Sequence, residues 1–214
     1  GIEKRHLVSN GEATSDMCKE VALELLKKSN KNPDEIDLIL VATSTPDVPV
    51  VSTAALVQDK IGAKNAWGYD IVAACTGFVY AMETGAKLVE SGKYKNVIVI
   101  GADTMSSIID YTDRNTCVIF GDGGGGVLLE PSDDDCGVLD SILLADGSGH
   151  KYLTVPAGGS LRPASKETID KKMHYVYQDG KAVFKFAVKN MADVSKEILD
   201  KNNIEGKELK LFIP

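Results

Sequence analysis

Apolar residues follow helical and strand-like spacings in turn along the chain. Residues 14–30, TSDMCKEVALELLKKSN, offer capping side chains from Thr14 to Asp16 and then apolar positions at Val21, Ala22, Leu25 and Leu26. This spacing predicts an amphipathic helix. After the breaker NKNPDE, the run IDLILVATST has the continuous apolar character of a buried parallel strand.

The alternation continues towards the middle of the chain. Ser52 is placed to cap a short helix, TAALVQDKI, which ends at Gly62. The strand AWGYDIV, a helix from Thr76 and the strand NVIVIGAD follow. Such successive βα units predict an α/β fold with a mainly parallel sheet covered by helices. The run TCVIFGDGGGGVLLE then predicts two apolar strands joined by a glycine turn.

A polar seam, PSDDDCG, separates this region from the rest of the chain. It predicts two domains, residues 1–134 and residues 135–214. The second contains a further αβ segment, formed by GVLDSILLA, a loop from Asp146 to about Lys172 and a helix near residues 181–201.

Composition narrows the class of protein. Of the 214 residues, 43% are hydrophobic and 26% charged, as in ordinary globular proteins. The formal charge of −7 argues against a nucleic-acid partner, and no apolar run has the length of a membrane span. The four cysteines have no CxxC spacing, which indicates neither a zinc site nor a redox dithiol, and sparse thiols favour a cytoplasmic location.

Both ends of the sequence have unusual character for natural termini. The chain begins with Gly1 rather than Met and stops in the apolar run LKLFIP. Because natural termini are usually polar and frayed, we interpret this chain as a piece of a longer protein.

Cys75 stands where a strand is expected to end and a helix to begin. The helix is indicated by apolar residues at helical spacing, namely Phe78, Ala81, Met82, Gly85, Leu88 and Val89. Unpaired amide groups and the positive end of the helix dipole favour a thiolate at such a position. The small residues Ala73, Ala74 and Gly77 leave room for a substrate. From the residues alone, a nucleophile and a buried structural cysteine both remain open.

The glycine cluster GDGGGG also satisfies the GxGxxG spacing of dinucleotide-binding loops. It is followed by VLLEPSDDD, however, which predicts a short strand and a turn. No helix N-terminus is then available to hold a pyrophosphate, so we reject a dinucleotide cofactor.

Three segments carry a family resemblance: the opening GIEKRH, DIVAACTGF around Cys75, and YTDRNTCVIFGDGGGG. Together they resemble β-ketoacyl-acyl-carrier-protein synthase III, the condensing enzyme that starts type II fatty acid synthesis, and the resemblance runs the length of the chain. It implies a thiolase-like fold of five αβαβα layers built from two similar halves, the second incomplete here. It also implies a homodimer.

The resemblance implies a covalent mechanism at Cys75. This residue would take an acyl group from acyl-coenzyme A, and a carbanion from malonyl-acyl-carrier protein would then attack the thioester. Coenzyme A would be a substrate, with no metal or separate cofactor. The family's His-Gln-Ala-Asn motif would follow Pro214, and its upstream tryptophan and arginine would precede Gly1, so this chain alone is not expected to complete the cycle. His6, His150 and His174 match none of these roles.

Further site residues follow from the same resemblance. Those expected to bind coenzyme A are Arg114, Ile119, Gly180, Lys181 and Phe184; those expected at the acyl pocket are Val50, Leu153 and Val176. For Arg114 the alternative is a surface ion pair with Asp110 or Asp113, and for Leu153 and Val176 it is core packing. The family loop matching TPDVPVVSTA crosses the dimer interface, where Val50 is smaller than the usual aromatic residue. A pocket tolerant of primers longer or more branched than acetyl is therefore expected.

A lysine stripe is the candidate docking surface for the carrier. Lys181, Lys185 and Lys189 recur every four residues on a predicted helix, whose intervening Val183, Phe184, Ala187 and Val188 are expected to face the core. The resemblance implies carrier docking near this helix; the alternative is a plain solvated face.

Two other classes of protein remain open. One is a sister thiolase-fold enzyme of the hydroxymethylglutaryl-coenzyme A or polyketide type. The other is a noncatalytic thiolase-fold binding protein, which failure of Cys75 to be acylated would favour.

Overall fold

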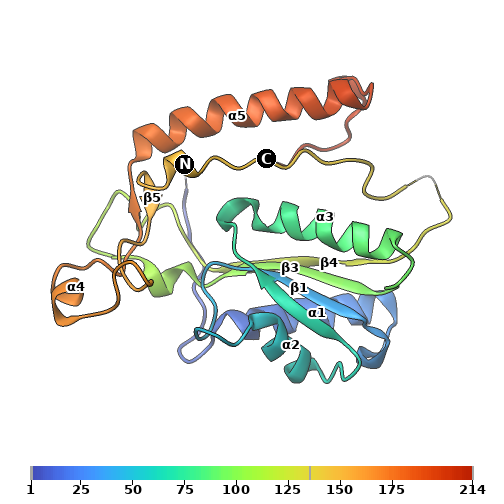
Figure 1. Ribbon diagram of the computed structural model, residues 1–214, viewed down its shortest axis with the longest axis horizontal. Helices are drawn as coiled ribbons and strands as arrows, with labels where there is room; N and C mark the ends of the chain where they lie inside the picture. Colours follow the sequence, from blue (N-terminus) through green and yellow to red (C-terminus); the bar gives the residue numbers. More distant parts are fainter. Residues whose placement is uncertain (1, 135, 214) are drawn as a thin grey trace. The chain divides into compact units, whose positions relative to one another are not determined.

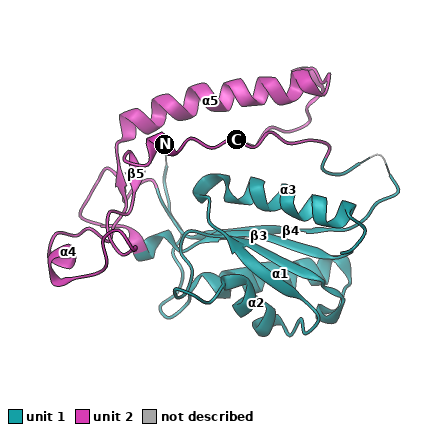
Figure 2. Ribbon diagram, viewed as in Figure 1, with its two compact units in different colours: residues 1–107, 120–138 teal, residues 108–119, 139–214 magenta. Residues whose placement is uncertain are grey.

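The computed structural model describes residues 2–134 and 136–213, which form two compact units (Figure 2). The first contains residues 1–107 and 120–138, and the second contains residues 108–119 and 139–214. The units therefore do not follow sequence order, because residues 108–119 pack with the later part of the chain. The domain boundary predicted between residues 134 and 135 falls at Asp135, which lies outside the described residues, and it stays a prediction.

A four-stranded sheet organises the first unit. Its strands are β1 (Leu38–Ala42), β2 (Trp67–Ile71), β3 (Val97–Asp103) and β4 (Gly123–Leu129), in the order β2-β1-β3-β4. The first three are parallel, and β4 runs antiparallel to β3. The predicted mainly parallel sheet is therefore confirmed.

Helices cover both faces of this sheet. Helices α1 (Thr14–Ser29) and α2 (Thr53–Ile61) lie on one face, and α3 (Gly77–Glu90) lies on the other (Figure 1). The central strand β1 is wholly buried and supplies both cores: Ile39 and Val41 pack towards α1 and α2, whereas Leu38 and Leu40 pack towards α3. The α/β prediction is confirmed, because each face of the sheet buries apolar residues beneath a helix.

The glycine run corrects the sequence prediction. Gly123 to Gly126 form the first part of β4 rather than a turn between two strands. A Cβ atom on Gly126 would lie 2.7 Å from the Val99 carbonyl oxygen and 3.0 Å from Val21 Cγ1. This strand therefore passes so close to β3 and α1 that a side chain at residue 126 has no room.

The predicted strand TCVIF, residues 116–120, is wrong as well. Its residues continue a turn, because the Cys117 amide donates to the Asp113 carbonyl at 3.0 Å and the Ile119 amide donates to that of Thr116 at 3.0 Å. Backbone groups occupied in this way are not available to a strand ladder.

Short elements and one long helix make up the second unit. Strands β5 (Leu153–Thr154) and β6 (Tyr177–Gln178) pair antiparallel, α4 covers Lys166–Asp170, and α5 covers Gly180–Lys201. The described residues of GVLDSILLA form no helix or strand. Across the chain, single 3-10 turns occur at η1 (Pro33–Glu35), η2 (Ala74–Thr76), η3 (Met105–Ile108), η4 (Gly147–Gly149) and η5 (Gly206–Glu208).

Helix α5 lies where the sequence predicts it, but its predicted core face is wrong. Phe184 is 70% exposed and Val188 is 55% exposed, and none of the helix's described side chains is fully buried. Ala182, Val183 and Ala187 are half-buried. The described segments of this chain therefore cover only part of the helix's apolar surface, which the spacing of apolar residues alone could not reveal.

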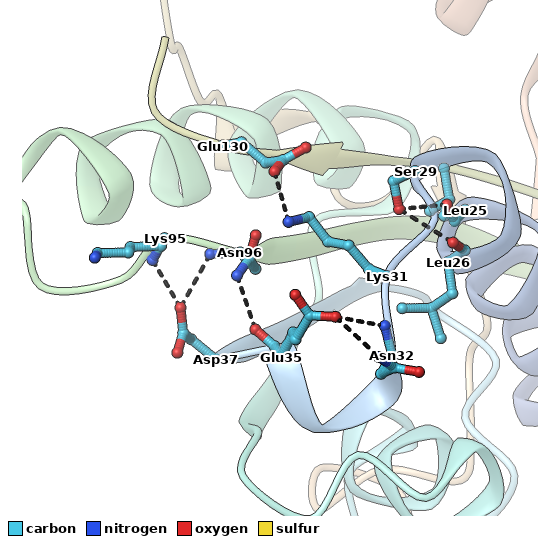
Figure 3. Close-up of polar contacts among 10 residues, drawn as sticks. All are labelled: Leu25, Leu26, Ser29, Lys31, Asn32, Glu35, Asp37, Lys95, Asn96 and Glu130. Carbon is cyan, nitrogen blue, oxygen red and sulfur yellow. Dashed lines mark hydrogen bonds and ion pairs between the residues drawn. The ribbon is translucent and has the colours of Figure 1, made fainter.

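Polar contacts secure the amino ends of the parallel strands (Figure 3). Asp37, just before β1, accepts the amides of Lys95 and Asn96, just before β3, at 2.7 and 3.0 Å. The Asn96 side chain donates to the Glu35 carbonyl at 2.8 Å, and the Glu35 carboxylate accepts the Asn32 amide at 2.7 Å. The polar groups at this edge of the sheet therefore hydrogen-bond to the adjoining loops. Ligands of α/β proteins usually bind at the opposite, carboxyl edge.

Candidate active site

Cys75 lies beyond the carboxyl end of β2. One 3-10 turn, η2, separates the strand from α3, and the Thr76 amide and hydroxyl both donate to the Ala73 carbonyl, at 3.2 and 3.1 Å. The thiol is free and exposed. The predicted strand-to-helix junction is therefore present, with one extra turn before the helix.

The backbone around Cys75 is tightly constrained. Ala74 has a φ of 47°, a left-handed conformation that non-glycine residues adopt at a cost. A Cβ atom on Gly77 would lie 3.1 Å from the Ala42 Cβ, so the start of α3 packs directly on the end of β1. A strained turn fixed by close packing holds the thiol at a defined place at the sheet's carboxyl edge.

A partly buried polar cluster occupies the same edge. Asp103, the last residue of β3, accepts hydrogen bonds from the Thr43 hydroxyl at 3.1 Å, the Ser44 amide at 2.8 Å and the Thr45 hydroxyl at 3.0 Å. The Thr45 hydroxyl in turn accepts the Thr104 amide at 2.8 Å. This cluster was not predicted from the sequence. Its signal there is the polar residues directly after two buried strands, in VATST and IGADT.

These contacts anchor the loop that carries Val50. Asp47 accepts the Ser15 amide at 2.8 Å and the Ser15 hydroxyl at 2.6 Å, which attaches the loop to the start of α1. After Asp47 the loop is exposed at Val48, Val50 and Val51, and Val50 has a φ of 80°. The loop thus has a base, residues 43–47, that hydrogen bonds hold in place, and an exposed apolar tip formed by the three valines.

The segment carrying Arg114 and Ile119 belongs to the second unit, and both side chains are exposed. The alternative ion pair for Arg114 is not present: Asp110 pairs with Lys172 at 2.8 Å, and Asp113 accepts the Thr116 hydroxyl at 2.9 Å. Within residues 2–134 and 136–213, no carboxylate pairs with Arg114. Within these ranges, its guanidinium is therefore not engaged in an ion pair.

The other expected binding residues gather around the β5–β6 pair. Leu153 lies in β5 and is exposed, whereas Val176, just before β6, is buried. The Asp179 amide donates to the Tyr152 carbonyl at 2.8 Å, which brings the start of α5, Gly180, beside this pair. The core-packing alternative therefore fits Val176 better than Leu153.

Further along α5, Phe184 and the three lysines of the stripe are exposed. No ion pair involves Lys181, Lys185 or Lys189 among the residues that the structure describes. The stripe therefore presents three positive charges along one helix that no described carboxylate compensates.

Among the described residues, the pKa shifts of Cys18 and Asp110 are large. Burial, reinforced by the carboxylates of Asp47, Asp70 and Asp103, raises the pKa of Cys18 to about 12. The Lys172 hydrogen bond, with further bonds from Thr112, lowers the pKa of Asp110 to about 2. Cys18 is thus a core thiol with little nucleophilic character.

Neither a metal site nor a membrane span is found among the described residues. Among them, no group of three or more His, Cys, Asp or Glu side chains is placed to hold a metal ion. None of the helices within the described ranges is both long and apolar enough to cross a membrane.

Comparison with known proteins places the chain in a family. Residues 69–147 match the sequence profile described as 3-Oxoacyl-[acyl-carrier-protein (ACP)] synthase III. The chain is 57% identical over 214 residues to the beta-ketoacyl-[acyl-carrier-protein] synthase III of Chlorobium chlorochromatii, covering 99% of this chain and 65% of that protein. It is 53% identical over 215 residues to the protein of the same name from Koribacter versatilis, covering 100% and 65%.

Solved structures agree with these sequence relatives. The 3-oxoacyl-[acyl-carrier-protein] synthase III of Aquifex aeolicus aligns with a TM-score of 0.87 and 37% identity, over 99% of this chain and 63% of that one. The synthase III of Thermus thermophilus aligns with a TM-score of 0.88 and 35% identity, over 100% and 65%. The chain thus has the expected thiolase-like fold class and spans about 65% of the length of these curated relatives. It belongs to the β-ketoacyl-acyl-carrier-protein synthase III family.

Proposed function

We propose that the protein containing this chain is an acyltransferase that initiates fatty acid synthesis. It moves an acyl group from acyl-coenzyme A to Cys75 and then condenses it with malonyl-acyl-carrier protein. The observation that carries this proposal is the exposed Cys75 thiol on a constrained strand-to-helix turn, inside the segment 69–147 that matches the family.

The two half-reactions use the same sulfur atom. The Cys75 thiolate attacks the thioester carbonyl, and coenzyme A leaves as its thiol. Malonyl-carrier protein then loses carbon dioxide, and the resulting carbanion attacks the Cys75 thioester, which releases the cysteine and leaves a β-ketoacyl group on the carrier. Because the first amides of a helix lack partners within it, the Cys75 amide is suited to stabilise the thioester oxygen.

Substrate recognition is divided among several elements in this proposal. Coenzyme A is bound by Arg114, Ile119, Gly180, Lys181 and Phe184. Of these, Arg114 forms no ion pair with a described carboxylate, and its planar guanidinium can stack on the nucleotide. The acyl pocket is lined by Leu153 and Val176, and Val50 from a second copy of the protein closes it. The lysines at 181, 185 and 189 receive the acidic carrier.

The enzyme acts as a homodimer, without a resident cofactor, in the cytoplasm. A second copy of the protein receives the apolar tip formed by Val48, Val50 and Val51, because exposed apolar side chains on a fixed loop suit a homodimer interface. The site needs no metal or resident cofactor, because the coenzyme A thioester is itself the substrate. We place the enzyme in the cytoplasm, where its free thiol stays reduced.

Acylation of the full-length protein tests the central step. Incubation with acetyl-coenzyme A, without carrier, should add the mass of one acyl group, and peptide mapping should locate it at Cys75. Cys75→Ser should abolish the adduct, whereas Cys136→Ser, which removes the other exposed thiol, should retain it. No adduct, or an adduct on another residue, would refute the proposed function.

A further inference from the structure

The segment that carries Arg114 is shaped by two consecutive carboxylate-capped turns. Asp110 Oδ1 accepts the Thr112 amide at 2.9 Å and the Thr112 hydroxyl at 2.6 Å. Asp113 Oδ1 accepts the Asn115 amide at 3.0 Å. Arg114 lies inside the second turn, between Asp113 and Asn115, and this turn follows directly on the first, so its backbone direction depends on both of them.

A lysine from a distant part of the second unit joins the first of these turns. Lys172 Nζ lies 2.8 Å from Asp110 Oδ2 and 2.9 Å from Thr112 Oγ1, across 62 and 60 residues of sequence. Asp110 therefore directs one oxygen to its own turn and the other to Lys172. The ammonium ties together the two side chains that define the turn.

The backbone of Lys172 supports a specific role for this side chain. Lys172 follows the end of α4 with a φ of 54°, a left-handed position at which glycine or asparagine is usually found. Its amide closes the turn by donating to the Ile169 carbonyl at 2.9 Å. A lysine at this position is in a strained backbone conformation, and its ammonium contacts the Asp110 carboxylate. Neighbouring Lys171 instead makes a local ion pair with Glu167.

We propose that Lys172 is a positioning residue for coenzyme A binding, holding the Asp110–Thr112 turn so that Arg114 is ordered before the nucleotide arrives. The inference rests on the proposed role of Arg114. Ordering a loop or a long side chain during binding costs conformational entropy, and a segment ordered beforehand avoids that cost. Loss of the Lys172 ammonium therefore weakens recognition of the nucleotide while the thiol chemistry continues.

Acylation kinetics of the full-length protein test this role. Lys172→Met should raise the KM for acetyl-coenzyme A by roughly three- to tenfold, the range expected for ordering one flexible side chain, with kcat retained. The acetyl thioester of N-acetylcysteamine, which has no nucleotide, should react as with the unaltered protein. Lys172→Arg should restore the KM, and Lys171→Met, which removes a neighbouring lysine, should leave it unchanged.

Arg114→Ala separates this inference from the proposed function. If both residues act in one unit, Lys172→Met should add little to the KM of the Arg114→Ala variant. A raised KM in Arg114→Ala with an unaltered KM in Lys172→Met would overturn the inference and leave the proposed function standing. An unaltered KM in Arg114→Ala would also overturn it. So would fully additive effects of the two substitutions on the KM, or an equal loss of activity with acetyl-coenzyme A and with the N-acetylcysteamine thioester. Asp110→Asn, which keeps an oxygen for the Thr112 turn and removes the carboxylate charge facing Lys172, should reproduce the Lys172→Met pattern.

Discussion

At the scale of single residues, the four cysteines lie in different environments. Cys18 is buried, Cys117 is half-buried, and Cys75 and Cys136 are exposed. Exposure alone therefore leaves two candidates for a reactive thiol. Cys75 differs from Cys136 in lying on a constrained 3-10 turn directly before α3, whereas Cys136 lies outside any helix or strand.

We expect Cys75 to be alkylated fastest near neutral pH. Cys18 should remain unlabelled in the folded protein, because it is buried and its thiol pKa is raised to about 12. Competition labelling with iodoacetamide followed by peptide mapping measures the order of reaction, and Cys136 is the control for exposure alone. Faster labelling of Cys117 or Cys136 would contradict the assignment.

Asp110 provides a prediction about pH. Its carboxylate contributes stability that is complete above the ordinary pKa of 3.8 and is lost as pH falls through the folded value of about 2. Lys172→Met removes the largest cause of that shift, although the Thr112 hydrogen bonds remain. The unfolding midpoint, measured across this pH window, should therefore fall more steeply in the unaltered protein than in the variant. Parallel curves would show that the ion pair contributes nothing to folding.

At the scale of elements, the close approach of β4 to β3 and α1 gives a paired prediction. Gly126→Ala should lower the free energy of unfolding by about 1–3 kcal/mol, because the new methyl group would overlap the Val99 carbonyl oxygen at 2.7 Å. Gly125→Ala is the control, since a Cβ atom there meets nothing within 4 Å. Denaturant unfolding measures both variants, and equal stabilities would show that β4 can move away from its neighbours.

The same glycines show where reasoning from sequence succeeds and where it fails. Periodicity predicted α1, α2, α3 and α5 and the three parallel strands, because their apolar spacing is a local property. The glycine run was interpreted as a turn because the steric contact that requires it comes from Val99 and Val21, far away in sequence. Asp103 was overlooked for a similar reason, since its partners follow a different strand.

The candidate site likewise has features that the sequence predicts and features that it does not. The location of Cys75 at a strand-to-helix junction was predictable from one continuous segment. The left-handed φ of Ala74 and the contact between Lys172 and Asp110 were not predictable, because each depends on how distant segments pack. The exposure of Phe184 likewise depends on what covers α5, which helical spacing does not specify.

At the scale of the whole molecule, the distribution of charge determines whether an acidic protein can bind an acidic carrier despite their mutual repulsion. The chain carries a formal charge of −7, which disfavours approach of a negative partner in general. Lys181, Lys185 and Lys189 on α5, which pair with no carboxylate in the described part of the chain, form a local exception. A docking surface of this kind would depend strongly on salt, because exposed charges are screened within about 10 Å at 0.1 M ionic strength.

Charge reversal in the full-length protein tests the lysine stripe. Lys185→Glu should raise the KM for malonyl-acyl-carrier protein several-fold at low salt, with a smaller effect at high salt, while acylation by acetyl-coenzyme A remains nearly unchanged. Lys27→Glu, an exposed position on α1, makes the same change in net charge and is the control. Equal carrier kinetics in the two variants would leave the stripe as an ordinary solvated surface.

The anchored loop after β1 has a consequence for how such a protein can change over evolution. Its folding contacts lie in residues 43–47, which bind Asp103 and Ser15, whereas the exposed valines beyond them contribute little to the core. Substitutions at exposed positions usually alter stability by no more than about 0.5 kcal/mol. The tip is therefore free to vary in size and shape while its base stays constant, so new preferences can be acquired there without compensating mutations elsewhere.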